Sequence, residues 1–322
     1  MSAPLIDRSP LDDACAGLRG RDLLSIRDLS RDELIALIAL TGDVRREPLR
    51  YSQALAGKTL ATIFEKPSLR TRVSFDIAAH QLGGHAIELG PEEVGLRGRE
   101  SIDDVARTLG GMVDGIVIRT FAHDTVERLA AAASIPVING LTDFSHPCQA
   151  LADFVTVHDL KGRLTGVRLA FVGDGNNVAN SLIFGAALLG VRMTFASPPG
   201  YGPRPAVLAW AKRHETVKGT ACRVVSSPEE AVEGADVVYT DTWVSMGQEA
   251  EADERRRAFA GFQVTEALLD GAEPQAIFMH CLPAHRGEEV AAEVIDSPRS
   301  AVFTQAENRL HSEKALLVAL MR

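Results

Sequence analysis

Short apolar runs rich in β-branched residues alternate with longer helical patterns along almost the whole chain. Clear examples are KTLATIF (58–64), GIVIRTF (115–121), RLAFVGDG (168–175) and AIFMHCLP (276–283). Strands separated by segments of helix length are not joined as hairpins, and such crossovers make neighbouring strands parallel. The sequence therefore predicts an α/β fold in which parallel sheets are flanked by helices.

Several of the helical segments have recognisable start or stop signals. Ser30 and Glu33 form a capping box, which predicts a helix that continues through ELIALIAL and ends near Gly42. Ser101 opens another helix with acidic residues in its first turn, where they favour the helix dipole. The segment ENRLHSEKALLVALMR (307–322) predicts a final helix that ends the chain.

The length of the chain indicates two domains. With 322 residues, of which 46% are hydrophobic and 24% charged, the chain can bury two cores of ordinary size. The pattern of alternating strands and helices restarts after the helical stretch HPCQALADFVTVHDLKG (146–162), so we expect the boundary in the helix after Pro147.

Charge and cysteine usage exclude several classes of partner. The net charge of -9 and the absence of a basic tract argue against a nucleic acid or an anionic membrane as partner. No apolar run approaches the length of a membrane-spanning helix, and acids near the N-terminus argue against a transit peptide. The scattered cysteines predict a reducing, cytoplasmic location; they are Cys15, Cys148, Cys222 and Cys281.

The stretch FEKPSLRTRVSFD (64–76) predicts an anion site. A strand that ends in a turn and leads directly into a helix directs backbone N–H groups at one point, and Ser68, Arg70 and Thr71 add hydroxyls and a guanidinium. An arginine at a helix N-terminus suits phosphate, and the field is local, so the acidic protein as a whole is no obstacle. The alternative is a surface helix whose arginines pair with nearby carboxylates such as Glu65.

This stretch resembles the S-x-R-T-R phosphate loop of the aspartate and ornithine carbamoyltransferases. Four further motifs of that family follow in order: HPCQ (146–149), DTWVSMG (241–247), HCLP (280–283) and ENRLH (307–311). Of these, DTWVSMG and HCLP resemble the ornithine branch in particular. The similarity extends from about Gly20 to Arg322. The chain is thus identified as a member of the family on five separate motifs.

The resemblance implies transfer of the carbamoyl group of carbamoyl phosphate to the δ-amine of L-ornithine, which gives L-citrulline and phosphate in arginine biosynthesis. It implies two doubly wound domains joined by interdomain helices. Residues 1–150, completed by the C-terminal helix at about 304–322, would bind carbamoyl phosphate, and residues 151–303 would bind ornithine. No cofactor and no metal are expected, and the family's catalytic unit is a homotrimer.

The resemblance also assigns site residues. The carbamoyl phosphate contacts would be Ser68, the backbone of Leu69, Arg70, Thr71, Arg119, His146, Gln149, Cys281, Leu282 and Arg309. The ornithine contacts would be Asn177, Asp241, Ser245 and Met246. The catalytic set would be Arg70, Arg119, His146, Cys281 and Arg309, in which His146 donates a hydrogen bond to the carbonyl oxygen as that oxygen gains negative charge.

Two positions depart from the family pattern. Leu69 stands where many relatives have threonine, which matters little if only its backbone N–H is used. Gly95 stands about where relatives carry a glutamine or histidine that reaches the neighbouring subunit's site. The contact between subunits at this position is therefore not expected in the usual form.

Some features of the sequence also suggest other functions. GDGNNV (173–178) is a partial dinucleotide fingerprint, but it lacks the third glycine, and no acidic residue closes VRMTFAS (191–197) to bind a ribose. A cysteine hydrolase built on Cys281 is disfavoured because the adjacent His280 would point to the opposite face of the strand. A carbamoyltransferase for putrescine or an N-acylornithine, and a non-catalytic amino-acid-binding homologue, stay open.

Overall fold

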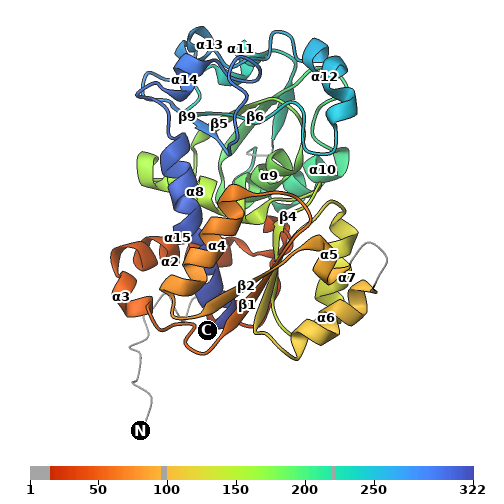
Figure 1. Ribbon diagram of the computed structural model, residues 1–322. Helices are drawn as coiled ribbons and strands as arrows, with labels where there is room; N and C mark the ends of the chain where they lie inside the picture. The colour runs from red at the N-terminus through yellow and green to blue at the C-terminus, as the bar shows by residue number, and fades with distance from the viewer. Residues whose placement is uncertain (1–14, 96–99, 220–221) are drawn as a thin grey trace. The chain divides into compact units, whose positions relative to one another are not determined.

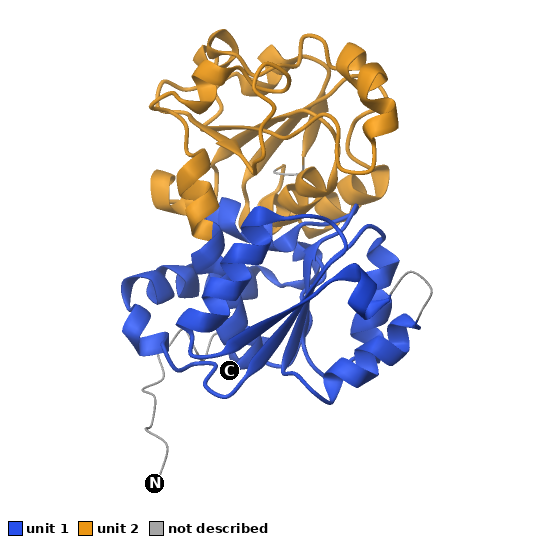
Figure 2. Cartoon of the chain, in the orientation of Figure 1, with its two compact units in different colours: residues 1–155, 309–322 blue, residues 156–308 orange. Residues whose placement is uncertain are grey.

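The computed structural model describes residues 15–95, 100–219 and 222–322, and the chain divides into two compact units (Figures 1 and 2). Unit 1 comprises residues 1–155 and 309–322, and unit 2 comprises residues 156–308. The chain passes from one unit to the other inside helix α8 (Pro147–Lys161) and returns inside helix α15 (Val302–Met321). The sequence-based division lies a few residues before each crossing.

Unit 1 is built on a four-stranded parallel sheet of order β2-β1-β3-β4. Its strands are β1 (Thr59–Phe64), β2 (His85–Leu89), β3 (Gly115–Arg119) and β4 (Val137–Leu141). The two inner strands β1 and β3 are almost entirely buried, which explains why they appear in the sequence as continuous apolar runs.

Helices cover both faces of this sheet. They are α2 (Arg31–Arg46), α3 (Pro48–Tyr51), α4 (Leu69–Gln81), α5 (Pro91–Val94), α6 (Ile102–Gly110) and α7 (His123–Ala132), with 3-10 turns at Ala16–Leu18 and Ile26–Asp28. On one face, apolar side chains of α6 and α7 form a core with Ala61, Ile63 and Ile118 of the strands. On the other face lies the end of α15, where the Met321 side chain closely approaches Gly115.

The predicted helix caps are confirmed, but one predicted helix end is wrong. Ser30 caps α2 in a capping box with Glu33, and Ser101 caps α6, as predicted. The predicted end of the first helix near Gly42 is wrong, because α2 continues to Arg46. The buried face of α2 runs on past the glycine to Val44, so packing outweighs the roughly 1 kcal/mol that a glycine costs inside a helix.

Unit 2 is built on a five-stranded parallel sheet of order β7-β6-β5-β8-β9. Its strands are β5 (Arg168–Val172), β6 (Arg192–Ala196), β7 (Arg223–Val225), β8 (Val237–Thr240) and β9 (Ile277–His280). Together the two sheets confirm the predicted class, parallel sheets flanked by helices. The edge strand β7 was not predicted, because it has only three residues and is mostly exposed.

The helices of unit 2 also pack on both faces of their sheet. They are α9 (Asn177–Leu189), α10 (Pro205–His214), α11 (Pro228–Val232), α12 (Ala252–Ala258), α13 (Glu266–Asp270) and α14 (Ala292–Ile295), with a 3-10 turn at Glu249–Glu251. Side chains of α11, α13 and α14 form one core with Val172, Val238 and Phe278. Within the described ranges, no helix has the length and apolar character needed to cross a bilayer.

The strand orders fix where each unit can hold a ligand. In unit 1 the strand order reverses at β1, because β2 is added on one side of it and β3 on the other. In unit 2 it reverses in the same way at β5, with β6 on one side and β8 on the other. In open α/β sheets, ligands bind outside the carboxyl ends of the strands at such a reversal. The residues that directly follow β1, β3, β5 and β8 are therefore the first candidates for ligand contacts.

Candidate active site

The predicted phosphate turn of unit 1 lies at this reversal point. Strand β1 ends at Phe64 and α4 begins at Leu69, so the turn occupies residues 65–68. Ser68 caps α4, since its Oγ accepts the backbone N–H of Thr71 at 3.2 Å. Helix α4 has 13 residues, long enough for its unpaired N–H groups and its dipole to favour an anion at the N-terminus.

The side chain of Leu69 points away from the protein, with 74% of the residue exposed. Of the two other cations in this stretch, Lys66 is buried in an ion pair with Asp143 and lies 4.4 Å from the centre of the Phe121 ring. Arg72 pairs with Glu88 on β2. The ion pair of Lys66 therefore holds the turn, the ion pair of Arg72 links α4 to β2, and Arg70 is the cation that the motif assigns to the phosphate.

Strand β3 and helix α8 bring two more predicted residues into the same unit. Arg119 ends β3 directly beside Phe64 in the sheet register and is only 7% exposed. His146 immediately precedes α8 and is buried. Burial, and then the positive charges of Arg309, Arg119 and Arg70, hold the pKa of His146 well below its usual range. At neutral pH this imidazole is uncharged and sits within a cluster of three arginines.

Arg309 links three helices of unit 1. Its Nη1 donates to Oε1 of Gln149 on α8 at 2.7 Å, and its Nη2 donates to Oγ1 of Thr71 on α4 at 3.1 Å. Arg309 itself lies on α15 and is 2% exposed. Eight of the ten residues predicted to contact carbamoyl phosphate thus belong to one compact unit; Cys281 and Leu282 belong to unit 2.

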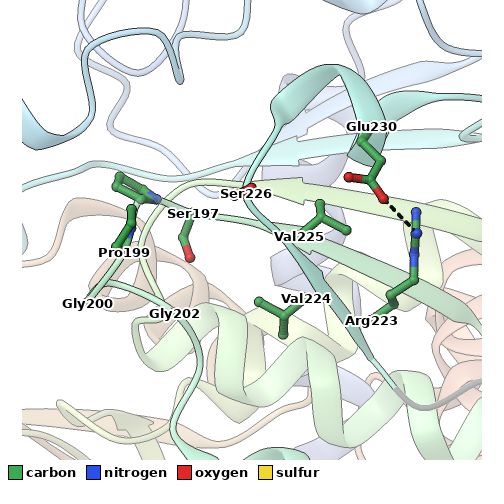
Figure 3. Close-up of a pocket in the computed structure, with 10 residues that line it drawn as sticks. Ser197, Pro199, Gly200, Gly202, Arg223, Val224, Val225, Ser226 and Glu230 are labelled. Atoms are coloured by element: carbon green, nitrogen blue, oxygen red, sulfur yellow. Dashed lines mark hydrogen bonds and ion pairs between the residues drawn. The ribbon is translucent and has the colours of Figure 1, made fainter.

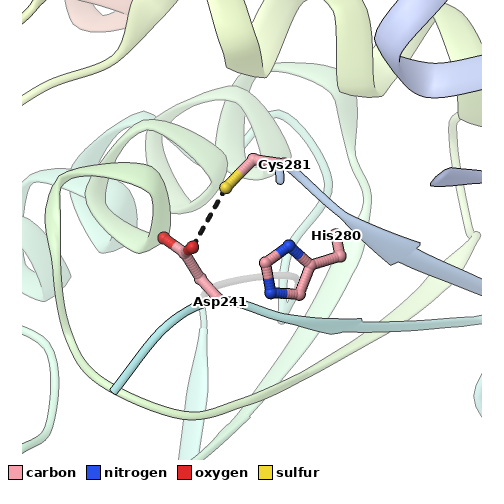
Figure 4. Close-up of side chains that lie close together, drawn as sticks. All are labelled: Asp241, His280 and Cys281. Atoms are coloured by element: carbon pink, nitrogen blue, oxygen red, sulfur yellow. Dashed lines mark hydrogen bonds between the residues drawn. The ribbon is translucent and has the colours of Figure 1, made fainter. Parts of the chain in front are cut away.

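The predicted ornithine residues gather at the reversal point of unit 2. Asp241 follows β8, and its Oδ2 accepts a hydrogen bond from Nδ2 of Asn176 at 2.7 Å. Its Oδ1 accepts from the Cys281 thiol at 3.0 Å, and Figure 4 shows these two side chains pointing toward one another. Cys281 directly follows β9, the neighbour of β8. Asp241 is only 6% exposed, so residues of unit 2 enclose most of its carboxylate.

Asn176 contacts a predicted site residue but was not itself predicted from the sequence. We predicted Asn177, which is the first residue of α9, whereas Asn176 both caps α9 and holds Asp241. Its Oδ1 accepts the N–H groups of Val178 and Ala179, each at 3.0 Å. An asparagine just before an apolar helical run is itself a cap signal, and this signal could have identified it.

His280 supports the backbone that carries Leu282. Its Nδ1 accepts the Leu282 N–H at 2.8 Å, and its Nε2 lies 3.1 Å from Oε1 of the fully buried Glu289. Leu282 has a φ of 57°, a left-handed conformation that costs a leucine roughly 1–2 kcal/mol, so its N–H needs such a fixed acceptor. Both ring nitrogens of His280 are engaged, so the ring is not available as a base for Cys281. The predicted reason is wrong, however: Cys281 lies beyond the end of β9, and a ring nitrogen of His280 lies within 4.8 Å of the Cys281 sulfur instead of on the opposite face.

Asp241, His280 and Cys281 lie close enough together to be tested as metal ligands (Figure 4). Both ring nitrogens of His280 are already engaged, one by a backbone N–H and one by Glu289. A ligating histidine needs one nitrogen free for the metal. This donor set therefore does not suit a metal ion.

The loop after β8 carries Ser245 and Met246, and an arginine holds the loop in place. Arg255 of α12 donates to the carbonyl of Trp243 at 3.1 Å and lies 3.2 Å from the carboxylate of Asp174. Burial raises the pKa of Asp174 to about 6, although Arg255 opposes this. The Met246 side chain is 42% exposed at the tip of the loop.

A separate hollow of about 600 Å³ lies in unit 2 at the carboxyl ends of β6 and β7 (Figure 3). Its lining shares no residue with the predicted ornithine set. The charged side chains on its rim, Arg223 and Glu230, are paired with each other at 2.8 Å. We assign no ligand to it.

Comparison with known proteins agrees with this arrangement. Residues 21–159 match the family model described as aspartate/ornithine carbamoyltransferase, carbamoyl-P binding domain, and residues 165–320 match the Asp/Orn binding domain of the same family. The chain belongs to the aspartate/ornithine carbamoyltransferase family. The resemblance predicted from five motifs is confirmed.

Individual relatives are similar over nearly their whole length. An ornithine carbamoyltransferase of Thermococcus kodakarensis is 51% identical, with 94% of this chain and 97% of the relative covered. One of Bacillus subtilis is also 51% identical, with 94% and 95% covered. The solved ornithine carbamoyltransferase of Pyrococcus furiosus is 50% identical with a TM-score of 0.91, and the match covers 94% of this chain and 98% of that one.

Proposed function

We propose that this protein transfers the carbamoyl group of carbamoyl phosphate to the δ-amine of L-ornithine, giving L-citrulline and phosphate as a step of arginine biosynthesis. The observation that carries the proposal is the cluster of Arg70, Arg119 and Arg309 around the uncharged, buried His146 in unit 1. Such a cluster matches a small dianion that bears a carbonyl group. The confirmed family and the relatives of about 50% identity support the same reaction.

Unit 1 provides the groups for carbamoyl phosphate. The N-terminus of α4, with Ser68, the Leu69 backbone, Arg70 and Thr71, would bind the phosphate oxygens. Neutral His146 has one ring N–H to donate to the carbonyl oxygen, while Arg119 and Arg309 add positive charge where the oxyanion develops. Gln149 would hold the carbamoyl amide.

Unit 2 provides the groups for ornithine. An α-amino acid carries one positive and one negative group, and a carboxylate with an adjacent amide can orient both. We assign the α-amino group to Asp241 and the α-carboxylate to Asn177, with Asn176 fixing the Asp241 carboxylate and Ser245 and Met246 contributing from the loop. Cys281 and the Leu282 backbone would then contact the reacting groups.

The reaction balances without a covalent enzyme intermediate. The neutral δ-amine attacks the carbonyl carbon, a C–N bond forms, the bond from carbon to the bridging oxygen breaks, and phosphate leaves. The amine loses one proton, and we assign the departing phosphate as its acceptor. A turnover rate that showed no dependence on ionisation of the δ-amine would contradict this step.

A substrate panel tests the proposed acceptor directly. The protein is incubated with carbamoyl phosphate and one amine at a time, with ornithine, putrescine, N-acetylornithine and aspartate compared by phosphate release and by chromatography of the carbamoylated product. We expect ornithine to be preferred by at least about 100-fold in kcat/KM, because among these amines only ornithine offers a free α-amino group, an α-carboxylate and a separate δ-amine. Preference for putrescine, or phosphate release that no amine stimulates, would contradict the proposal.

We also propose that the protein acts in the cytoplasm as a homotrimer or a multiple of trimers, on the basis of the family resemblance and the absence of a basic tract. Light scattering coupled to size-exclusion chromatography measures the assembly. A mass of one or two chains of 34.6 kDa at micromolar concentration would contradict the trimer.

A further inference from the structure

A fully buried carboxylate, Glu313, lies one turn beyond Arg309 on α15. Both Nε and Nη2 of Arg309 donate to its Oε1, at 3.0 and 2.5 Å. Burying an ionised carboxylate costs several kcal/mol unless it is paired; here burial raises the pKa of Glu313, and the two contacts from Arg309 oppose this. None of the family motifs in the sequence includes Glu313, and the proposed reaction has not used it so far.

The contacts of Glu313 determine which part of the guanidinium faces the other site residues. Arginine carries its donors in a rigid planar fork. Because Glu313 occupies the Nε and Nη2 edge, the terminal donors are directed at Gln149, 2.7 Å from Nη1, and at Thr71, 3.1 Å from Nη2. Both of these residues belong to the proposed carbamoyl phosphate site, so Glu313 orients Arg309 toward that site.

The charge of Glu313 also acts on the arginine cluster. Burial by itself lowers the pKa of Arg309, but the adjacent Glu313 carboxylate more than offsets this, so the pKa is raised. Glu313 thus fixes the guanidinium before any ligand binds. It also places a negative charge beside Arg309, which reduces the attraction of that arginine for a dianion.

A neighbouring contact shows the same kind of support. The Nε2 atom of Gln149 donates to Oδ1 of the buried Asp153 at 2.8 Å, and this leaves the Gln149 oxygen facing Arg309. Thus one carboxylate orients the amide and another orients the guanidinium. Of the two, only Glu313 contacts a proposed catalytic cation directly through two of its donors.

We propose that Glu313 is a positioning residue for carbamoyl transfer: it fixes the guanidinium of Arg309 for the developing oxyanion, and its charge limits phosphate affinity so that the product leaves. The inference rests on the proposed role of Arg309. A purely structural ion pair would instead affect only the stability of the protein. The two functions of the carboxylate, geometry and charge, can be separated by substitution.

Two variants make that separation. Glu313→Gln keeps the shape and removes the charge, whereas Glu313→Asp keeps the charge and shortens the reach. For Glu313→Gln we expect kcat to fall about 10-fold and the Kd of inorganic phosphate to fall by at least about 5-fold, because a negative charge is removed close to Thr71, a proposed phosphate contact. For Glu313→Asp we expect a similar fall in kcat with wild-type phosphate affinity.

The measurements are steady-state kinetics and calorimetric titration of phosphate, with a melting curve to establish folding. Glu47→Gln, an exposed glutamate at the end of α2, is the matched control and should match wild type in both assays. The inference is overturned if Glu313→Gln weakens phosphate binding while it lowers kcat, or if the substitution changes only the melting temperature. If the glutamine variant does not fold, the aspartate variant decides, and an unchanged kcat there overturns the inference.

Arg309→Gln separates this inference from the proposed function. We expect it to lower kcat by at least about 100-fold, since removal of one oxyanion donor typically costs that much. Near-wild-type activity of Arg309→Gln would contradict the role assigned to Arg309 in the reaction. An inactive Arg309→Gln beside a wild-type-like Glu313→Gln would overturn the inference about Glu313 alone.

Discussion

The two units use the same architecture for opposite electrostatic tasks. In each, residues that follow neighbouring parallel strands meet where the strand order reverses. In unit 1 they surround an uncharged histidine with arginines, one of which is almost completely buried. In unit 2 they include two buried carboxylates: Asp241, which accepts from an amide and a thiol, and Asp174, which is paired with Arg255.

The two sites also differ in what supports them. Arg309 and Gln149 project from long helices and are fixed by buried carboxylates of the same unit. The predicted contacts Ser245 and Met246 lie on an irregular loop that is held by Arg255. A preorganised helical site suits charge stabilisation in the reaction, and a loop suits a substrate that has to enter and leave. The difference predicts separable effects of mutation.

The largest expected effect is on the dianion. Arg70→Gln should lower kcat/KM for carbamoyl phosphate by about 10³-fold, because a charge-assisted contact to the phosphate is lost at the start of α4. Steady-state kinetics measure the change. Arg128→Gln, an exposed arginine paired with Asp103 on unit 1, serves as control and should stay within about 2-fold of wild type. A loss of less than 10-fold for Arg70→Gln would remove Arg70 from the site.

The next effect concerns the amino acid. Asp241→Asn should raise KM for ornithine by about 100-fold, since the charge that pairs with the α-amino group is removed. The exposed Asp253→Asn on α12 is the matched control. The comparison between the units fails if Asp241→Asn changes KM for carbamoyl phosphate as much as KM for ornithine.

The third prediction concerns the pH dependence of ornithine binding by unit 2. Burial raises the pKa of Asp174 to about 6, so lowering the pH below 6 neutralises the partner of Arg255 and loosens the loop. With the ornithine concentration expressed as the fraction whose δ-amine is neutral, we expect KM to rise several-fold between pH 7 and pH 5, and Asp174→Asn to show the higher value at both pH values. A wild-type KM that, expressed in this way, does not change between pH 7 and pH 5 would contradict the role of this pair.

Ionisation of Asp174 supports the loop contact but lowers the free energy of unfolding. Because the folded-state pKa of Asp174 lies above its ordinary value of 3.8, its contribution to the free energy of unfolding is fully present below pH 3.8 and is lost as the pH rises through about 6. Ionised Asp174 therefore costs stability at neutral pH, where the loop contact is formed.

The smallest effect is expected at Cys281. Its thiol donates to Asp241 at 3.0 Å, a weak hydrogen bond, and His280 is not available as its base. Cys281→Ala should therefore lower kcat/KM no more than about 10-fold. Complete loss of activity with an intact melting curve would indicate a covalent role for the thiol instead.

The sequence predicted the strands better than the ends of the helices. Buried parallel strands such as β3 stand out as β-branched runs, whereas helix ends depend on packing that is not local. Thus α2 passes Gly42, and α15 starts at Val302, slightly before the predicted start at about residue 304. Strand β7 is too short and exposed to produce a periodic signal.

The predicted site residues came from motifs, but their supporting contacts could not be predicted. Glu313 and Arg255 act through side chains that fold to within hydrogen-bonding distance of their partners, and neither stands in a pattern of its own. Glu313 in particular appears in the sequence as an ordinary charged residue on a helix. Only its burial shows that its charge has to be paired.

The most direct test of the account is the affinity of a phosphonate analogue of carbamoyl phosphate, with a methylene in place of the bridging oxygen, for wild type, Arg70→Gln and Asp241→Asn. Calorimetric titration in the absence of any amine isolates binding to the dianion site. We predict at least a 100-fold loss for Arg70→Gln and a change of no more than about 2-fold for Asp241→Asn. Equal losses in the two variants would contradict the assignment of the dianion to unit 1 and the amino acid to unit 2.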